Sequence, residues 1–428
     1  MNAPIALREG WCPGALAPMR TGDGLLVRLR VSGRPLSLDR VEAIADCAAR
    51  YGNGVIELSS RANIQLRGVR EATLPDLQRR LSALGLIDAN AADEAARNIV
   101  ASPIADIDPG AILDVSPIVV ALEARIAVHP SLRRLPAKFG FLIDGGGALP
   151  LGDVEADVRF EAFRDEDGAR FAVALAGDDD AVAVCAPREI PGVAASLAAA
   201  FLREAVARGD SLRRMRELTL AHGAAPVLGA AGLRPARLPA SPRRAARQRD
   251  FIGTHPLGDS FFVGAAPVLG RMTAEDFLFL ALEARRCLAA DIRVTPLRAL
   301  IVSGLQRRGA QDLAAALAPR FIVDPADPRL AVVACAGAPA CAKAARRVQA
   351  EALAFASALA SGAAIALHVS GCAKGCAHPR AAPFTLVARP SGYDLVVNGR
   401  AGDEPLRVAL PPSEIAPLLA RLQGKPWP

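Results

Sequence analysis

The sequence contains few aromatic residues and very few lysines. Phe, Trp and Tyr together make up 4% of its 428 residues, and no basic-aromatic run is present on which nucleic-acid bases could stack. Only four of its 51 basic residues are lysine, so the net charge of +7 is carried almost entirely by arginine. This composition argues against a nucleic-acid partner. It favours a ligand with several carboxylates, because the planar guanidinium can bind a carboxylate through two hydrogen bonds.

Long apolar runs are also missing. No stretch approaches the roughly 18 apolar residues that a membrane-spanning helix needs. The segment Met1 to Gly10 lacks the charged-then-apolar order of a secretory signal. We therefore expect no contact with a membrane and a location in the reducing cytoplasm. The length leaves room for about three domains.

Four of the eight cysteines form two close pairs near the C-terminus. Cys335 and Cys341 have five residues between them, and Cys372 and Cys376 have three. Gly, Ala and Pro surround each sulfur, which is typical of tight turns whose backbone N–H groups can approach an inorganic cluster. Four thiolates are what a [4Fe–4S] cluster requires. A structural zinc site, whose paired ligands usually lie two to four residues apart, and two disulfides both remain open at this point.

The chain contains an internal repeat. Residues 21–69 align without a gap on residues 257–305, at a constant offset of 236 (257 − 21), and identical pairs such as Ile56 with Ile292 recur along it. Each copy shows the pattern of strand, helix and strand, with Ser37 capping a helix over 38–51 and Thr273 capping one over 274–289. The repeat predicts a duplicated fold with an approximate two-fold axis. A further helix is expected over 343–361, between the cysteine pairs.

Three short motifs resemble those of the siroheme sulfite and nitrite reductase superfamily, and the resemblance spans essentially the whole chain. They are Ser59 to Gly68, Ala96 to Pro103 and Leu135 to Phe139. The resemblance implies an α+β fold, a duplicated nitrite/sulfite reductase-like fold with two ferredoxin-like half-domains and two larger α/β domains around a pseudo-two-fold axis. The expected limits are 1–75 and 246–318 for the half-domains, 76–245 for the first α/β domain with its linker, and 319–428 for the α/β domain that carries the cluster.

Other segments are similar to the precorrin-3B synthase family. They are Trp11 to Arg28, Lys138 to Gly147, and Val369 to Pro379. Two positions depart from the reductases. Gly140 stands where their lysine motif usually has a second Lys, and His378 stands where they often carry Arg after the last cysteine.

This second resemblance implies an oxidoreductase of cobalamin biosynthesis. It would be an oxygen-dependent monooxygenase that hydroxylates precorrin-3A and closes a γ-lactone to give precorrin-3B. Electrons derived from NADH would arrive through an external reductase and the [4Fe–4S] cluster. A mononuclear non-haem iron is associated with the family, but the sequence identifies neither its ligands nor a catalytic residue. A monomer is expected.

Two other functions remain possible at this point. One is a siroheme-dependent sulfite or nitrite reductase, and the other is a non-catalytic Fe–S or zinc protein.

The resemblance also implies roles for individual residues. Cys335, Cys341, Cys372 and Cys376 would bind the cluster, with Cys376 nearest the macrocycle. Arg61, Arg97 and Lys138 would bind substrate carboxylates, with Arg67 and Arg298 as weaker candidates and Asn63 and Gln65 as polar contacts. Strand alternation would place Arg61, Asn63 and Gln65 on one face. The alternatives are surface ion pairs for the arginines and structural hydrogen bonds for the two amides.

Overall fold

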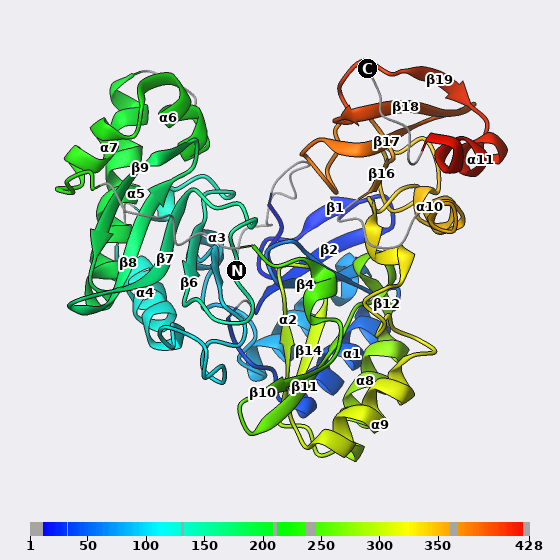
Figure 1. The fold of residues 1–428 in the computed structure, drawn as a ribbon, viewed down its shortest axis with the longest axis horizontal. Helices are drawn as coiled ribbons and strands as arrows, with labels where there is room; N and C mark the ends of the chain where they lie inside the picture. The colour runs from blue at the N-terminus through cyan, green and yellow to red at the C-terminus, as the bar shows by residue number, and fades with distance from the viewer. Residues whose placement is uncertain are drawn as a thin grey trace.

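The computed structural model describes residues 12–31, 33–129, 132–208, 212–236, 245–359 and 366–422. Two half-domains that pack together form its central body (Figure 1). One α/β domain lies on each side of this body, one built from β5 to β9 and the other from β15 to β19 (Figure 1).

The first half-domain is an antiparallel sheet covered by helices on one face. Its strands, in spatial order, are β1 (Met19–Thr21), β2 (Gly24–Arg30), β4 (Asn63–Val69) and β3 (Val55–Leu58). The helices are α1 (Leu38–Tyr51) and α2 (Leu74–Ala83). Ser37 caps α1 as predicted, with its hydroxyl accepting a hydrogen bond from the Arg40 amide. Because Leu77 and Leu81 of α2 pack in the core, this half-domain extends past the expected limit at residue 75.

The second half-domain repeats this arrangement. Its strands follow the equivalent order: β10 (Gly253–Leu257), β11 (Ser260–Ala265), β14 (Leu300–Leu305) and β13 (Asp291–Val294). Its helices are α8 (Ala274–Arg286) and α9 (Arg307–Leu317), so α8 ends three residues before the predicted limit. Ala62 and Arg298, 236 positions apart (298 − 62), both adopt left-handed backbone, with φ of 52° and 56°. The predicted duplication is confirmed, and equivalent residues of the two copies share even an unusual backbone conformation.

The two half-domains exchange backbone pairings across the two-fold axis. β12 (Arg271–Thr273) joins the first sheet, where Met272 lies opposite Ile56. In return, Leu36 pairs with Ile292 of the second sheet through hydrogen bonds of 2.8 and 2.9 Å. Leu36 and Met272 occupy equivalent positions of the repeat, and so do Ile56 and Ile292. The two contacts are therefore related by the two-fold axis. α1 and α8 complete one continuous core between the sheets.

The first α/β domain has a five-stranded mixed sheet. Its strands are β5 (Ile99–Ala101), β6 (Phe141–Asp144), β7 (Val158–Asp165), β8 (Gly168–Leu175) and β9 (Asp178–Cys185). Its helices are α3 (Ala91–Ala96), α4 (Ser116–Val128), α5 (Ile190–Ala207), α6 (Met215–His222) and α7 (Ala225–Ala230). The segment Pro187–Ala207 is long and apolar enough to cross a membrane by composition alone. Leu197, Ala198 and Phe201 of this segment are fully buried in the domain's core, so it is a core helix.

The second α/β domain has the same strand directions. Its strands are β15 (Val332–Ala334), β16 (Leu367–Ser370), β17 (Ala382–Arg389), β18 (Gly392–Gly399) and β19 (Arg407–Leu410). In both domains the first three strands are parallel and the last two pair antiparallel.

The helices of this domain are α10 (Val348–Ala356) and α11 (Pro412–Leu422). The helix expected over 343–361 is therefore shorter at both ends. The Ala345 amide bonds the carbonyl of Gly371 at 3.0 Å, which holds the preceding residues in a loop. Ser361 lies outside the described residues.

Candidate functional site

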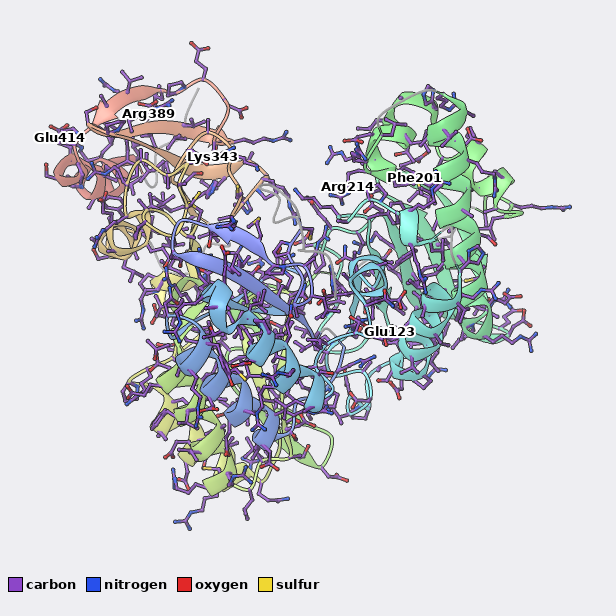
Figure 2. All side chains as sticks on the ribbon, turned by 180° about the vertical axis from the view of Figure 1, so that it is seen from behind. Glu123, Phe201, Arg214, Lys343, Arg389 and Glu414 are labelled. Carbon is purple, nitrogen blue, oxygen red and sulfur yellow. The ribbon has the colours of Figure 1, made fainter. Side chains whose placement is uncertain are left out.

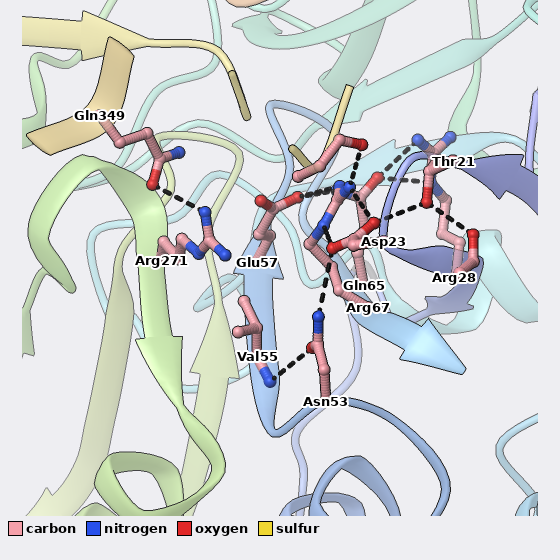
Figure 3. A network of polar contacts seen from close by, with 12 residues as sticks. Thr21, Asp23, Arg28, Asn53, Val55, Glu57, Gln65, Arg67, Arg271 and Gln349 are labelled. Atoms are coloured by element: carbon pink, nitrogen blue, oxygen red, sulfur yellow. Dashed lines mark hydrogen bonds and ion pairs between the residues drawn. The ribbon is translucent and has the colours of Figure 1, made fainter. Parts of the chain in front are cut away.

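One face of the first half-domain sheet is polar. Arg28 on β2 lies opposite Gln65 on β4, and Arg30 lies opposite Asn63, while the residues that alternate with them enter the core. Arg28 donates to the Gln65 side-chain oxygen at 2.7 Å, and Gln65 donates to Glu57 at 3.3 Å (Figure 3). Gln65 thus orients the guanidinium of Arg28. The side chain of Asn63 is buried.

Arg61 lies beside this face but not in the strand. β4 begins at Asn63, and Arg61 belongs to the preceding turn, so strand alternation does not place it as predicted. Its guanidinium donates to the carbonyl of Lys138 at 3.1 Å. Burial, together with the nearby Arg214, lowers the pKa of Arg61. Among the described residues neither Arg61 nor Arg28 forms an ion pair with a carboxylate, which leaves both charges available to a ligand.

Two of the four predicted cysteine ligands directly follow parallel strands. Cys335 comes after β15, and the Gly371-Cys372 turn comes after β16. The Gly371 amide donates to the Cys335 sulfur at 3.1 Å. A Cβ at Gly371 would lie 2.6 Å from the Cβ of Ala344 and 3.2 Å from that sulfur, so this approach requires glycine.

The four cysteines are free and interact electrostatically. Burial raises the pKa of Cys335, while the Gly371 and Gly337 amides act to lower it. Burial also raises the pKa of Cys376, against the opposing charges of Lys374 and Lys138. Cys376 is the most exposed of the four, and it is the one on which the charge of Lys138 acts.

The cysteine turns carry free thiols and an amide-to-sulfur hydrogen bond, which fit the surroundings of an Fe–S cluster. In the part of the chain that the structure describes, no three or more His, Cys, Asp or Glu side chains are grouped so that they could hold one metal ion. Amide-to-sulfur bonds such as that from Gly371 are the contacts that tune a thiolate-bound Fe–S cluster. The same observation leaves a mononuclear iron without an identifiable ligand set among these residues.

Arg298 contacts the second cysteine turn from the other half-domain. Its guanidinium donates to the carbonyl of Ala377 at 3.0 Å, and burial lowers its pKa. Beside it, the imidazole of His368 is fully buried, and neither ring nitrogen has a hydrogen-bond partner among the described residues. Burial, with His378 and Arg298 nearby, lowers the pKa of His368 to about 4. Arg298 thus lies next to the cluster loop, as a cleft residue would.

Comparison with known proteins identifies the family. Residues 17–84 match the nitrite/sulfite reductase ferredoxin-like half domain. A precorrin-3B synthase from Sinorhizobium sp is 35% identical over 94% of this chain and 85% of its own length. The chain belongs to the precorrin-3B synthase family.

More distant relatives share the scaffold of this precorrin-3B synthase family member. A ferredoxin–nitrite reductase from Synechococcus elongatus is 26% identical over 89% of this chain and 81% of its own length. The solved structure of the NirA protein of Mycobacterium tuberculosis covers 93% of this chain and 80% of its own, with a TM-score of 0.76 at 20% identity. That likeness establishes the fold, as the sequence predicted.

Two predicted substrate ligands of this precorrin-3B synthase family member are engaged within the protein. Arg97 pairs with Asp88 at 2.8 Å and with Glu123 at 3.2 Å. Glu123 also pairs with Arg34, so it lies where α4 meets the first half-domain (Figure 2). Burial acts to lower the pKa of Arg97, but the two carboxylates raise it. Arg97 therefore connects two carboxylates of the protein, and its role in binding substrate stays a prediction.

Arg67 is the second of these residues. The residue is 4% exposed, and its guanidinium is bonded to Asp23 and Glu57. The motif does form a strand, as predicted, and both carboxylates come from other strands or turns, while the role of Arg67 in binding a substrate stays a prediction.

Two residues at the site escaped the sequence-based prediction. Arg28 donates to the sulfur of Cys12 at 3.1 Å, and Cys12 also interacts electrostatically with Arg61. The alternation of apolar and basic residues over 25–31 was the available signal for Arg28. The Cys12-Pro13 motif was the signal for Cys12; Trp11 of the same motif lies outside the described residues.

Proposed function

We propose that the chain converts precorrin-3A to precorrin-3B, the product that its Sinorhizobium relative's name states. The supporting observation is the cluster of cations without carboxylate partners among the described residues. Arg61 and Arg28 are half-buried, and Lys138 lies close enough to act on the charge of Cys376. A tetrapyrrole with a rim of carboxylates would supply the missing anions, and each charge-assisted hydrogen bond would help to fix its orientation.

The proposed reaction inserts one atom of O2 into the substrate's meso C–H bond between rings A and D. The second oxygen atom leaves as water, which consumes two electrons and two protons. The acetic acid side chain of ring A then adds across the adjacent double bond, its oxygen to the ring carbon and its proton to the meso carbon, which closes a γ-lactone without a leaving group. Arg61 and Arg28 bind peripheral carboxylates, and Gln65 holds Arg28 in place. Arg298 would contact the same ligand, which its hydrogen bond to the carbonyl of Ala377 beside Cys376 supports.

Cys335, Cys341, Cys372 and Cys376 would hold a [4Fe–4S] cluster. When bound, the cluster supplies single electrons, which an external reductase would draw from NADH. Free thiols at all eight cysteines agree with a reducing compartment, so we propose a cytoplasmic enzyme that works as a monomer.

A siroheme-dependent sulfite or nitrite reductase is the second candidate, supported by the shared fold. Gly140 argues against it. Its amide donates to Asp157 at 2.9 Å, and a Cβ there would lie 2.9 Å from the Asn98 side-chain nitrogen. The second lysine of the reductase motif would therefore have to displace the Asn98 side chain at this position.

The test is turnover of precorrin-3A under 18O2, with the protein purified anaerobically and supplied with a reducing system. We expect one labelled oxygen atom in the product and an absorption spectrum with a broad cluster shoulder. Product without label would contradict the monooxygenase proposal. A strong Soret band from bound siroheme would favour the reductase.

A further inference from the structure

Arg67 connects three parts of the molecule through all three nitrogens of its guanidinium. Nε and Nη2 donate to Asp23 at 3.0 and 2.8 Å, and Nη1 donates to Glu57 at 3.1 Å (Figure 3). Nη2 also donates to the carbonyl of Ala340 at 2.9 Å. Ala340 directly precedes Cys341, so this bond joins the half-domain sheet to the first cysteine loop.

The Ala340 carbonyl has a second donor from the same half-domain. The Gly22 amide, in the turn between β1 and β2, bonds it at 3.2 Å. A Cβ at Gly22 would collide with the carbonyl of Pro339, so this turn lies directly against the loop. Inside the loop, the Cys341 amide bonds Gly337 at 2.7 Å. The position of Cys341 is thus set from the sheet as well as from its own domain.

The other half-domain carries a matching brace. Arg293 on β13 is 2% exposed, pairs with Asp291 and Asp106, and donates to the carbonyl of Pro103 at 2.9 Å. Pro103 belongs to the loop after β5, which corresponds to the loop after β15 but has no cysteine. Each half-domain therefore holds one loop with a buried arginine, and only the loop held by Arg67 carries predicted cluster ligands.

We infer that Arg67 is a positioning residue that holds Cys341 in the geometry a [4Fe–4S] cluster needs. This inference rests on the cluster in the proposed function. The rigid fork, fixed by two carboxylates, keeps the Ala340 carbonyl in place and with it the adjacent cysteine. Through Glu57 and Gln65 the same network reaches Arg28 (Figure 3). Loop position and substrate contact are therefore linked by consecutive hydrogen bonds.

The test compares Arg67→Lys with Arg293→Lys in the full-length protein, reconstituted with iron and sulfide without oxygen. Both changes remove a fork and keep the charge, so Arg293→Lys controls for the loss of a buried brace. In Arg67→Lys we expect iron to be lost to a chelator about tenfold faster than in the wild type. The electron paramagnetic resonance spectrum of the reduced cluster should also change. Arg293→Lys should match the wild type in both measurements.

Equal iron loss from both variants, or no change in Arg67→Lys, would overturn the positioning role. A wild-type protein without iron would instead refute the proposed cofactor, which separates the two failures. Should Arg67→Lys fail to fold, Gly22→Ala displaces the same loop with Arg67 intact. It should also speed iron loss about tenfold, and wild-type behaviour in that variant would overturn the inference.

Discussion

Each α/β domain has a loop after its first strand and another after its second. The side chains that connect these two loops differ between the domains. After β15 and β16, the Gly371 amide donates to the Cys335 sulfur at 3.1 Å. At the equivalent place after β5 and β6, the Gly145 amide donates to the Ser102 hydroxyl at 3.0 Å. The amides of Ser102 and Cys335 bond the carbonyls of corresponding residues at 3.2 Å, which confirms the match.

Carboxylates seal the first pair of loops. Asp144 accepts from the Ser102 hydroxyl at 3.0 Å and from the Leu151 amide at 2.7 Å, and Asp108 accepts from the Ala148 amide at 2.6 Å. The second pair has free thiols at its turns. The duplicated scaffold therefore offers the same two turns twice. One pair is closed by hydrogen bonds to carboxylates, and the other carries free thiols at the corresponding turns.

The largest effect is expected when a cysteine of the second α/β domain is replaced by the residue that the first domain has at the corresponding position. Cys335→Ser introduces the hydroxyl found at Ser102. Because Fe–S clusters need soft thiolate ligands, we expect loss of bound iron and abolished turnover. Iron content and the cluster's absorption would be measured. Cys287→Ser, far from the loops, should keep its iron, and full iron in Cys335→Ser would contradict the cluster assignment.

The next prediction separates free from paired arginines. Arg61→Ala should raise the KM for substrate about 10- to 100-fold, since a hydrogen bond to a charged group contributes about 1.5–3 kcal/mol. Arg97→Ala should instead lower the free energy of unfolding by about 3 kcal/mol, because it removes the ion-pair partner of Asp88 and leaves Glu123 paired with Arg34 alone. Steady-state kinetics and denaturant titration check both. An unchanged KM in Arg61→Ala would remove that residue from the site.

The third prediction concerns the pH dependence of stability. It again replaces a residue of the second α/β domain by its counterpart in the first. His368 occupies the position of Leu142 on β6, and burial, with His378 and Arg298, lowers its pKa to about 4. Stability should be complete above the unfolded pKa near 6.5 and be lost as pH falls towards 4. The loss should reach about 2 kcal/mol at pH 5. Denaturant titration of wild type and His368→Leu at pH 7.5 and 5 measures it. An equal loss in the variant would exclude His368 as the cause.

The smallest effect is expected at Ser102. Ser102→Ala removes the hydroxyl that accepts from Gly145 and donates to Asp144, which should cost about 1–2 kcal/mol of unfolding free energy. Iron content and turnover should be unchanged, because this loop pair carries no cluster ligand. A drop in iron content would show that the two pairs of turns are not independent.

The repeat and the cysteine turns were predictable because their signals are local. A fixed offset and the caps Ser37 and Thr273 predict both central helices, and small residues around Cys335 indicate a tight turn. The duplication of the α/β domains was not visible in residue identities. The similarity of these domains lies in their strand directions and in hydrogen bonds of the backbone, such as that from the Gly145 amide. Many different sequences can form such bonds, so they leave no signal in residue identities.

The sequence also did not predict which arginines would pair with carboxylates of the protein. Arg67 and Arg97 occur in the expected motifs, but their partners Asp23 and Asp88 lie 44 and nine residues away. Whether a guanidinium meets a carboxylate or remains free depends on how turns and strands meet in space. No local pattern records that outcome.

The reciprocal pairing of Leu36 with Ile292 and Met272 with Ile56 has a consequence for assembly. Each half-domain lends backbone to the sheet of the other, so neither sheet edge is complete alone. The halves are therefore interlocked by non-covalent contacts as well as joined by the chain. A polypeptide opened between α7 and β10 should reassemble from two separately produced fragments, whereas either fragment alone would expose an unpaired edge and self-associate.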